Sequence, residues 1–191
     1  MGTIVFSENR HAFMIPYEDG EALCNPSTPQ EEGAKWVYSL GRLPTDHVVV
    51  LGLGAGHHIA ALKDIYPHLQ ITVIERRDNL LQMFRNQYPE LWNEIEVVCL
   101  DSVSSVTAQA FYQRIVEEHS YVISFRESWG VHCGFYTELF AAATGRSVIS
   151  LNYHFREIGM NLKSRYNPHP LNFSVSPEVS GFEISQIEEA G

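Results

Sequence analysis

The sequence has 191 residues, which is long enough for one domain with a complete hydrophobic core and too short for two ordinary ones. Its formal net charge is −10, and its 13 Lys and Arg residues are scattered along the chain. This charge pattern excludes nucleic acid and anionic membranes as partners. It favours a small ligand or a protein as the partner, and a homo-oligomer is left open. Residues 1–8 show neither a basic leader nor a signal-peptide run, and no apolar stretch approaches the roughly 20 residues that span a bilayer, so a cytoplasmic location is expected.

The first elements along the chain form an extension of about 45 residues. Two short β-prone runs, residues 3–6 and 12–15, predict a hairpin. A helix is then expected to begin after Thr28, because Thr28 can cap it and Glu31 stands three residues later, as a capping box requires. Gly41 should end this helix.

From residue 46 onward, strands alternate with helices. This alternation predicts a doubly wound α/β fold of the Rossmann type, with a mainly parallel sheet and helices on both faces. We expect the domain limits to be 1–45 for the hairpin and helix extension, 46–175 for the nucleoside-binding domain and 176–191 for a flexible tail. The expected strands are 47–51, 70–75, 94–100, 121–125 and 147–151, and the expected helices are 56–66, 79–88, 103–119 and 135–144.

A glycine-rich turn, Gly52-Leu53-Gly54-Ala55-Gly56, directly follows the first buried strand and opens a helix. Glycines at such a turn let a ligand approach the backbone, and the free N–H groups of a helix start favour anionic groups. Glu75 ends the next strand, where an acid suits the 2′- and 3′-hydroxyls of a ribose. Asp101 ends the third strand and is placed to meet an adenine edge. Together these residues predict a small-molecule nucleoside ligand.

The turn, Glu75 and Asp101 resemble the nucleoside-binding signature of class I S-adenosylmethionine-dependent methyltransferases over about residues 46–151. The resemblance implies S-adenosylmethionine as the cofactor, bound by Gly52, Leu53, Gly54, Gly56, His58, Glu75 and Asp101. NAD fits less well, because His57 stands where the dinucleotide motif GxGxxG has its third glycine. The chain departs from the methyltransferase pattern at Val50, where these enzymes usually have an acid that helps to hold the methionine moiety.

A second resemblance covers more of the chain. The segments NPSTPQEEGA (25–34), LGLGAGHHI (51–59) and VIE (73–75) are similar to the N-terminal Rossmann-like region of motility accessory factor proteins, and FREIGMNL (155–162) is faintly similar to a later segment. These bacterial proteins take part in glycosylating flagellin with nonulosonic acids. The resemblance implies an accessory module and transfers no catalytic residue.

The loop after the fourth strand contains the candidate catalytic residues. Arg126 could hold an acceptor carboxylate or phosphate, Glu127 could take a proton, and Trp129 could stack on a ligand. The leading interpretation is methyl transfer to a small acceptor. A non-catalytic accessory module related to flagellin or surface-glycan modification is the first alternative. An aminopropyl transferase similar to polyamine synthases is the second, weakened because no acidic pair follows the fourth strand.

The cysteines and histidines do not predict a metal site. The three cysteines lie far apart without a CxxC pair, and the nine histidines include no HExxH motif. His57 and His58 are adjacent, so their side chains point about 100° apart on a helix. At a helix start they should stay neutral, and either could donate a hydrogen bond to a bound carboxylate.

Overall fold

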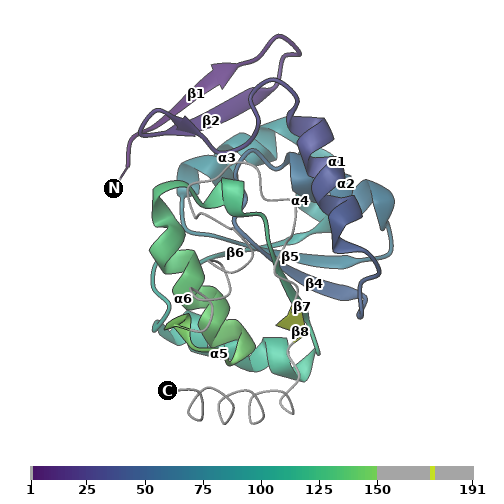
Figure 1. The fold of residues 1–191 in the computed structure, drawn as a ribbon, viewed down its shortest axis with the longest axis vertical. Helices are drawn as coiled ribbons and strands as arrows, with labels where there is room; N and C mark the ends of the chain where they lie inside the picture. Colours follow the sequence, from purple (N-terminus) through teal and green to yellow (C-terminus); the bar gives the residue numbers. More distant parts are fainter. Residues whose placement is uncertain (1, 150–172, 175–191) are drawn as a thin grey trace, which may run out of the picture.

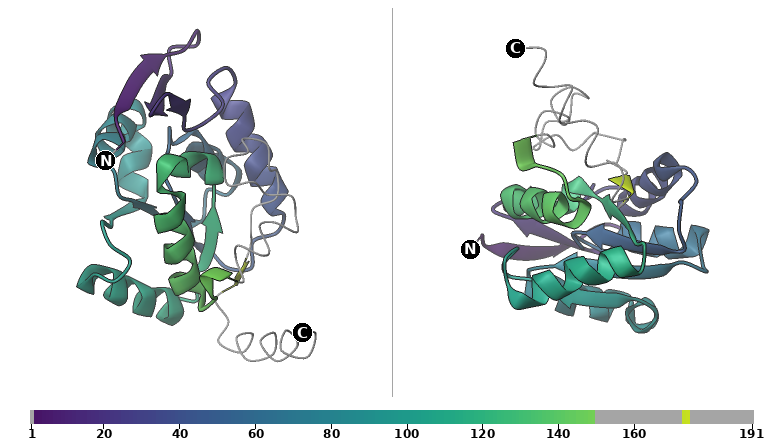
Figure 2. Two further views of the ribbon diagram at one scale, coloured as in Figure 1. Left: turned by 60° about the vertical axis from the view of Figure 1, so that its left-hand side comes forward. Right: turned by 90° about the horizontal axis from the view of Figure 1, so that it is seen from below.

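A computed structural model describes residues 2–149 and 173–174, which form two separate sheets with helices around the larger one (Figure 1). The smaller sheet is antiparallel and consists of β1 (Ile4–Glu8), β2 (Met14–Glu18) and β3 (Glu21–Ala22). The predicted hairpin is therefore confirmed, whereas the two-residue strand β3 was not predicted. We refer to residues 4–24 as the N-terminal arm. Figure 2 shows the arm at one end of the molecule.

The larger sheet has the order β6-β5-β4-β7-β8. The strands β4 (His47–Leu51), β5 (Gln70–Glu75), β6 (Glu96–Cys99) and β7 (Tyr121–Ser124) pair in parallel. In order of appearance they lie 3-2-1-4, which is the first part of the Rossmann arrangement. The predicted α/β fold with a mainly parallel sheet is confirmed.

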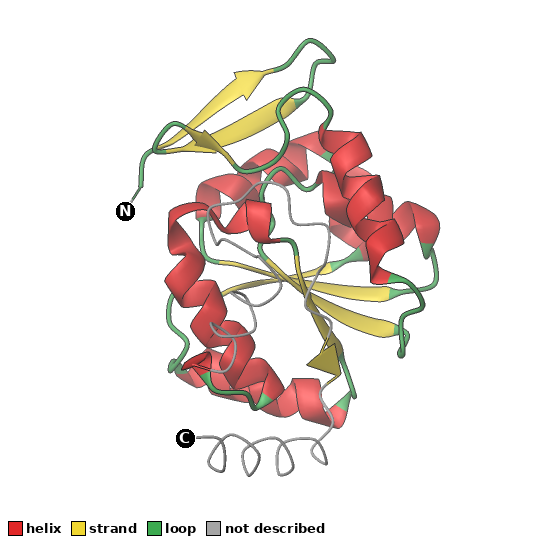
Figure 3. Ribbon diagram, viewed as in Figure 1, coloured by secondary structure: helices red, strands yellow, loops and turns green. Residues whose placement is uncertain are grey.

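Helices cover both faces of this sheet (Figure 3). On one face lie α1 (Pro29–Leu40), α2 (His57–Ile65), α3 (Asp78–Gln87) and α4 (Pro89–Glu94), and on the other lie α5 (Val106–Glu117) and α6 (Cys133–Thr144). The side chains of β4 alternate between the two cores: Val48 and Val50 face α1 and α2, whereas Val49 and Leu51 face α5 and α6.

Helix α1 is part of the core, although it precedes the alternating region. Trp36 packs in the same core as Val48 and Val50, and its indole Nε1 donates to the Ser124 carbonyl over 3.0 Å. The helix begins and ends as predicted, but the capping box does not form, because Thr28 makes no side-chain cap bond. Instead, the side chain of Asn25 accepts from the Thr28 amide over 3.2 Å and holds the preceding loop.

The end of the parallel region differs from the prediction. Residues 148 and 149 are helical, so the predicted strand 147–151 is wrong there, and its last two residues lie outside the described part. Periodicity alone cannot assign a short apolar run to a strand. The place beside β7 is taken by β8 (Phe173–Ser174), which pairs antiparallel. The predicted tail 176–191 also lies outside the described residues, and the limits of the three predicted regions stay a prediction.

A 3₁₀ segment, Arg126–His132, follows β7 directly and was not predicted as an element. We call it the crevice segment, because it lies at the carboxyl end of the sheet next to the glycine turn. Helix α4 was also not predicted. Within the described ranges no helix combines the length and the apolar character needed to cross a membrane.

Candidate functional site

The glycine turn joins the central strand β4 to helix α2. Gly52, Gly54 and Gly56 have φ values of 93°, 49° and 81°, which residues with a Cβ rarely adopt. The turn lies at the end of β4, where the strand order reverses, because β5 and β6 lie on one side of β4 and β7 lies on the other. Open α/β sheets bind ligands in the crevice at this switch point. The predicted nucleoside turn therefore stands where a ligand site belongs in this fold.

Side chains of the chain itself lie against the turn. A Cβ on Gly52 would overlap Ser128 Oγ and stand 2.8 Å from Trp129 Cδ1. A Cβ on Gly54 would stand 2.8 Å from Ser128 Cβ and 2.9 Å from the Leu23 carbonyl oxygen. The space that glycine leaves open is therefore taken by the crevice segment and by the end of the N-terminal arm.

The third glycine of the turn, Gly56, lies directly against the ring of the core residue Phe84. Replacing Gly56 with alanine should lower the free energy of unfolding by about 2–5 kcal/mol, because left-handed strain adds to overpacking. The new Cβ would overlap the ring of Phe84. Gly145→Ala is the matched control, because Gly145 has a φ of 68° with nothing within 4 Å of a Cβ. Urea unfolding measures both, and equal losses would contradict the packing role of Gly56.

Glu75 ends β5 as predicted, but its carboxylate is fully buried and turned toward the protein. A carboxylate offers about four lone-pair positions. Six hydrogen bonds from the chain itself reach this one, so its acceptor capacity is filled. The donors to Oε1 are the Arg76 amide (2.8 Å), the Arg77 amide (3.1 Å), Arg77 Nε (2.7 Å) and the Tyr136 hydroxyl (2.8 Å), and the donors to Oε2 are the Leu53 amide (2.9 Å) and Arg77 Nη2 (2.9 Å).

Arg77 holds the crevice together from its centre. Its guanidinium grips both oxygens of Glu75, donates to the Ser128 carbonyl over 2.7 Å, and lies 3.2 Å from Glu18 Oε2. The side chains of Arg77, Glu75 and Glu18 are 6%, 0% and 1% exposed. One buried cation thus joins β5, the crevice segment and the N-terminal arm.

Glu18, on strand β2, fastens the arm to the crevice segment. Its Oε2 accepts from the Val131 amide over 3.0 Å, and its Oε1 lies 3.1 Å from His132 Nε2. The arm is also tied to α3, where Gln87 accepts from the Met14 amide over 2.8 Å. The arm therefore closes over the carboxyl end of the sheet, as its place in Figures 1 and 2 shows.

The pair at the centre of the network keeps its charges. Burial by itself would raise the pKa of Glu75, but the Arg77 charge and the hydrogen bonds from Arg77, Leu53 and Tyr136 hold that pKa below its usual value. Burial by itself would lower the pKa of Arg77, and the carboxylates of Glu75 and Glu18 raise it above its usual value. Burial and the Glu75 charge raise the pKa of Tyr136. At neutral pH Glu75 is therefore a carboxylate, Arg77 a cation and Tyr136 an intact phenol.

His58 is hydrogen-bonded to the backbone of the glycine turn. Its Nε2 lies 3.1 Å from the Gly52 carbonyl oxygen, and its ring stacks on Phe125 with centroids 4.3 Å apart. Burial lowers the pKa of His58 to about 3, so the neutral ring donates its proton to the Gly52 carbonyl. Burial lowers the pKa of His57 to about 4, and its Nδ1 lies 2.6 Å from the Tyr88 hydroxyl. These pKa directions agree with the neutral histidines that we expected.

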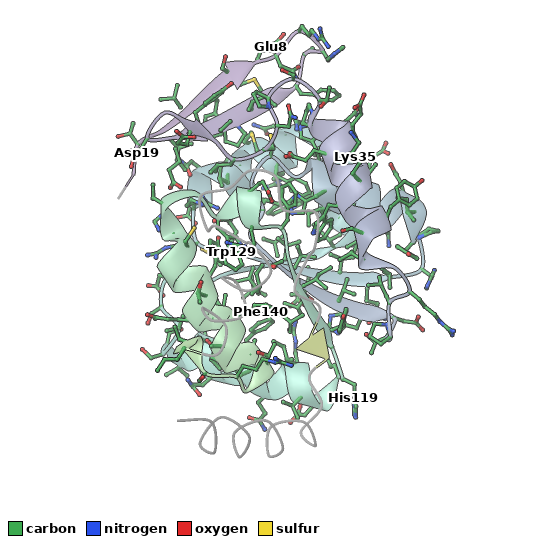
Figure 4. The ribbon with its side chains drawn as sticks, viewed as in Figure 1. Glu8, Asp19, Lys35, His119, Trp129 and Phe140 are labelled. Atoms are coloured by element: carbon green, nitrogen blue, oxygen red, sulfur yellow. The ribbon has the colours of Figure 1, made fainter. Side chains whose placement is uncertain are left out.

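Trp129 is not placed to stack on a ligand. Its side chain is fully buried beside α6 (Figure 4), its Nε1 donates to the Leu51 carbonyl over 2.8 Å, and its ring stacks on Tyr136 with centroids 5.5 Å apart. The stacking role expected from the sequence is therefore wrong in this conformation, because the aromatic ring fills the core under the sheet.

The other predicted residues lie at the rim. Asp101 is exposed two positions after the end of β6, and it takes no part in the contact between the Leu53 amide and Glu75. Arg126 and Glu127 are partly buried at the start of the crevice segment, and Arg126 lies 5.9 Å from the centroid of the Trp129 ring. Burial lowers the pKa of Arg126. Their predicted catalytic roles stay a prediction.

Sequence reasoning missed the residues that close the site, Glu18, Arg77, Ser128 and Tyr136. Arg77 had one signal, because it follows Glu75 by two positions and belongs to the longest basic run, Arg76-Arg77. Glu18 had none, since 59 residues separate it from Arg77 in the chain. Within the described part, no group of three His, Cys, Asp or Glu side chains is placed to hold a metal ion.

No family model matches the chain, and no curated protein matches it significantly in sequence. The solved structures that are similar to the chain include two spermidine synthases and a methyltransferase. A spermidine synthase in complex with the transition-state analogue AdoDATO is 13% identical with a TM-score of 0.43, and the spermidine synthase from Thermotoga maritima is 13% identical with a TM-score of 0.42; each match covers 76% of this chain and 60% of that one. The mitomycin 7-O-methyltransferase MmcR is 17% identical with a TM-score of 0.39, over 69% of this chain and 48% of that one. The chain thus spans about half to three-fifths of the length of these proteins, and similarity at this level identifies neither a ligand nor a reaction for it.

Proposed function

We propose that this chain is a non-catalytic binding module built on a Rossmann-like scaffold. The observation that carries the proposal is the Glu75 carboxylate, whose acceptor positions are filled by six donors of the chain itself. A methyltransferase would need this carboxylate for a ribose. As described, the crevice does not fit S-adenosylmethionine, because Ser128 also lies against Gly52.

Two further features support a module. Val50 stands where the resembling methyltransferases have an acid for the methionine moiety, and it is fully buried in the core. The net charge of −10 suits a protein partner with a basic face. The resemblance to motility accessory factors supports a role beside enzymes of flagellin or surface-glycan modification.

Nucleoside binding, with methyl transfer to a small acceptor, is the second candidate. It is favoured by the glycine turn, which stands at the switch point of a 3-2-1-4 sheet. The cofactor would be S-adenosylmethionine, at Gly52, Leu53, Gly54, Gly56, His58, Glu75 and Asp101. This candidate requires Arg77 and the crevice segment to leave their described positions.

Calorimetry separates the two candidates. We expect S-adenosylmethionine, S-adenosylhomocysteine and NAD to give no binding heat at ligand concentrations up to about 1 mM, which corresponds to a binding free energy weaker than about −4 kcal/mol. An active class I methyltransferase in the same buffer serves as the positive control. A micromolar dissociation constant for S-adenosylmethionine would refute the closed module and establish the nucleoside binding that the second candidate requires.

A further inference from the structure

The most unusual feature of the crevice is the pairing of Arg77 with Glu75. The guanidinium donates Nε to one carboxylate oxygen over 2.7 Å and Nη2 to the other over 2.9 Å. A ribose with free 2′- and 3′-hydroxyls would present two O–H donors to the same two oxygens, at a similar spacing. Arg77 and a ribose diol therefore compete for one acceptor.

We propose that Arg77 is an internal occupant of a ribose site, held there by Glu18 of the N-terminal arm, so that the crevice admits a ribose-bearing ligand only when the arm releases it. The inference rests on the closed crevice proposed above. It adds the chemistry of the displaced ligand, a vicinal diol, and the contact that controls its entry.

The remaining contacts of Glu75 fit a ligand site once the guanidinium is removed. The amides of Leu53, Arg76 and Arg77 and the Tyr136 hydroxyl would still donate to the carboxylate. These donors favour the charged form of Glu75 without a cation. Removing the guanidinium would take one donor away from each oxygen, so the two hydroxyls of a diol could replace Nε and Nη2 donor for donor.

Glu18 makes the position of Arg77 in the ribose site depend on the N-terminal arm. It bonds Arg77 on one side and the Val131 amide on the other, so the same carboxylate fixes the internal occupant and the crevice segment. Gly130 permits this close approach, since a Cβ there would stand 2.7 Å from Leu23 Cδ2 and against the Glu18 carboxylate. Lifting the arm removes both contacts at once.

The test uses the full chain with Glu18→Gln and Arg77→Met combined. The double substitution removes the cation together with one of its two carboxylates, and the amide oxygen introduced by Glu18→Gln can still accept from the Val131 amide. Binding of adenosine, compared by calorimetry with 2′,3′-dideoxyadenosine, should be at least about tenfold tighter in the variant than in the wild type, and the dideoxy analogue should show no gain. Adding Glu75→Gln should abolish the gain.

The outcomes separate this inference from the proposed function. Micromolar adenosine binding by the wild type overturns the closed crevice itself. A folded double variant that binds adenosine no better than the wild type, or binds the dideoxy analogue equally well, overturns only the role of Arg77.

The single variant Glu18→Gln covers the case in which the double variant does not fold. It leaves Arg77 and Glu75 paired, but a neutral amide holds Arg77 and the Val131 amide less strongly than a carboxylate does. The arm should therefore open more often, and the Val131 amide should exchange with deuterium at least about tenfold faster than in the wild type. Adenosine should speed this exchange further, because it binds only when the arm has released Arg77, and dideoxyadenosine should not. Exchange at the wild-type rate, or no effect of adenosine on it, overturns control by the arm.

Discussion

Replacing Arg77 with methionine should lower the free energy of unfolding by about 3–5 kcal/mol at pH 7. Methionine keeps the length and apolar stem of the side chain but removes the guanidinium that contacts both Glu75 and Glu18. Both carboxylates are at most 1% exposed, so water cannot replace the guanidinium. Denaturant unfolding followed by circular dichroism measures the loss.

Arg76→Met is the matched control, because it changes the same residue type one position earlier. Arg76 is partly buried, and its guanidinium lies 4.6 Å from the centroid of the Phe135 ring. Losing this cation–π contact should cost about 0.5–1 kcal/mol. If the two variants lose the same stability, the buried ion network does not stabilise the fold in the way described.

The Arg77→Met deficit should also shrink as the pH falls from 7 toward 5. Without the cation, only the hydrogen bonds from Leu53 and Tyr136 oppose the effect of burial, so the pKa of Glu75 in the folded variant lies above its pKa in the folded wild type. A carboxylate with a raised folded pKa binds more protons when folded, so acid stabilises the variant relative to the wild type. A deficit that grows toward pH 5 would contradict this assignment.

Acid should weaken the wild-type fold well before ordinary carboxylates titrate. His57 and His58 have folded pKa values of about 4 and about 3, below the 6.5 of a free histidine, because both are buried. Between these values the unfolded chain binds more protons than the folded one, so stability is present above pH 6.5 and is lost as the pH falls. The slope approaches about 1.4 kcal/mol per pH unit and per histidine below pH 6.5, so we expect a loss of about 3 kcal/mol between pH 6.5 and 5.

Two variants test the assignment to these histidines. His58→Gln removes the titrating ring and keeps an amide donor for the Gly52 carbonyl, so it should flatten the pH dependence by about half. His68→Gln is the control, because the His68 side chain is 63% exposed and should leave the dependence unchanged. Equal unfolding free energies of the wild type at pH 7 and pH 5 would rule out buried neutral histidines.

The sequence allowed the parallel core and the place of the glycine turn to be predicted, because both depend on local patterns. The run of valines in β4 is buried on both faces, and its continuous apolar character is typical of that environment. The short elements β3, with two residues, and α4, with six, were not predicted from the sequence. Such lengths show no measurable periodicity.

The state of the candidate site could not be predicted from local patterns. An acid at a strand end gives the same sequence pattern whether it faces a ligand or an arginine. The choice is made by Glu18 and Ser128, which lie 59 and 51 positions from Arg77 in the chain and reach it only through tertiary packing. The role of Glu75 thus depended on contacts that no spacing rule reports.

Trp129 supplies an optical reporter of the crevice. Its indole is packed between the end of β4 and Tyr136, and Tyr136 in turn bonds Glu75. Any movement of the crevice segment would bring water to this ring and shift its fluorescence to longer wavelength. Trp36 lies in the opposite core and Trp92 lies on α4. Replacing both with phenylalanine would leave Trp129 as the single fluorescent tryptophan, and its emission wavelength would then follow the movement of the crevice segment in real time.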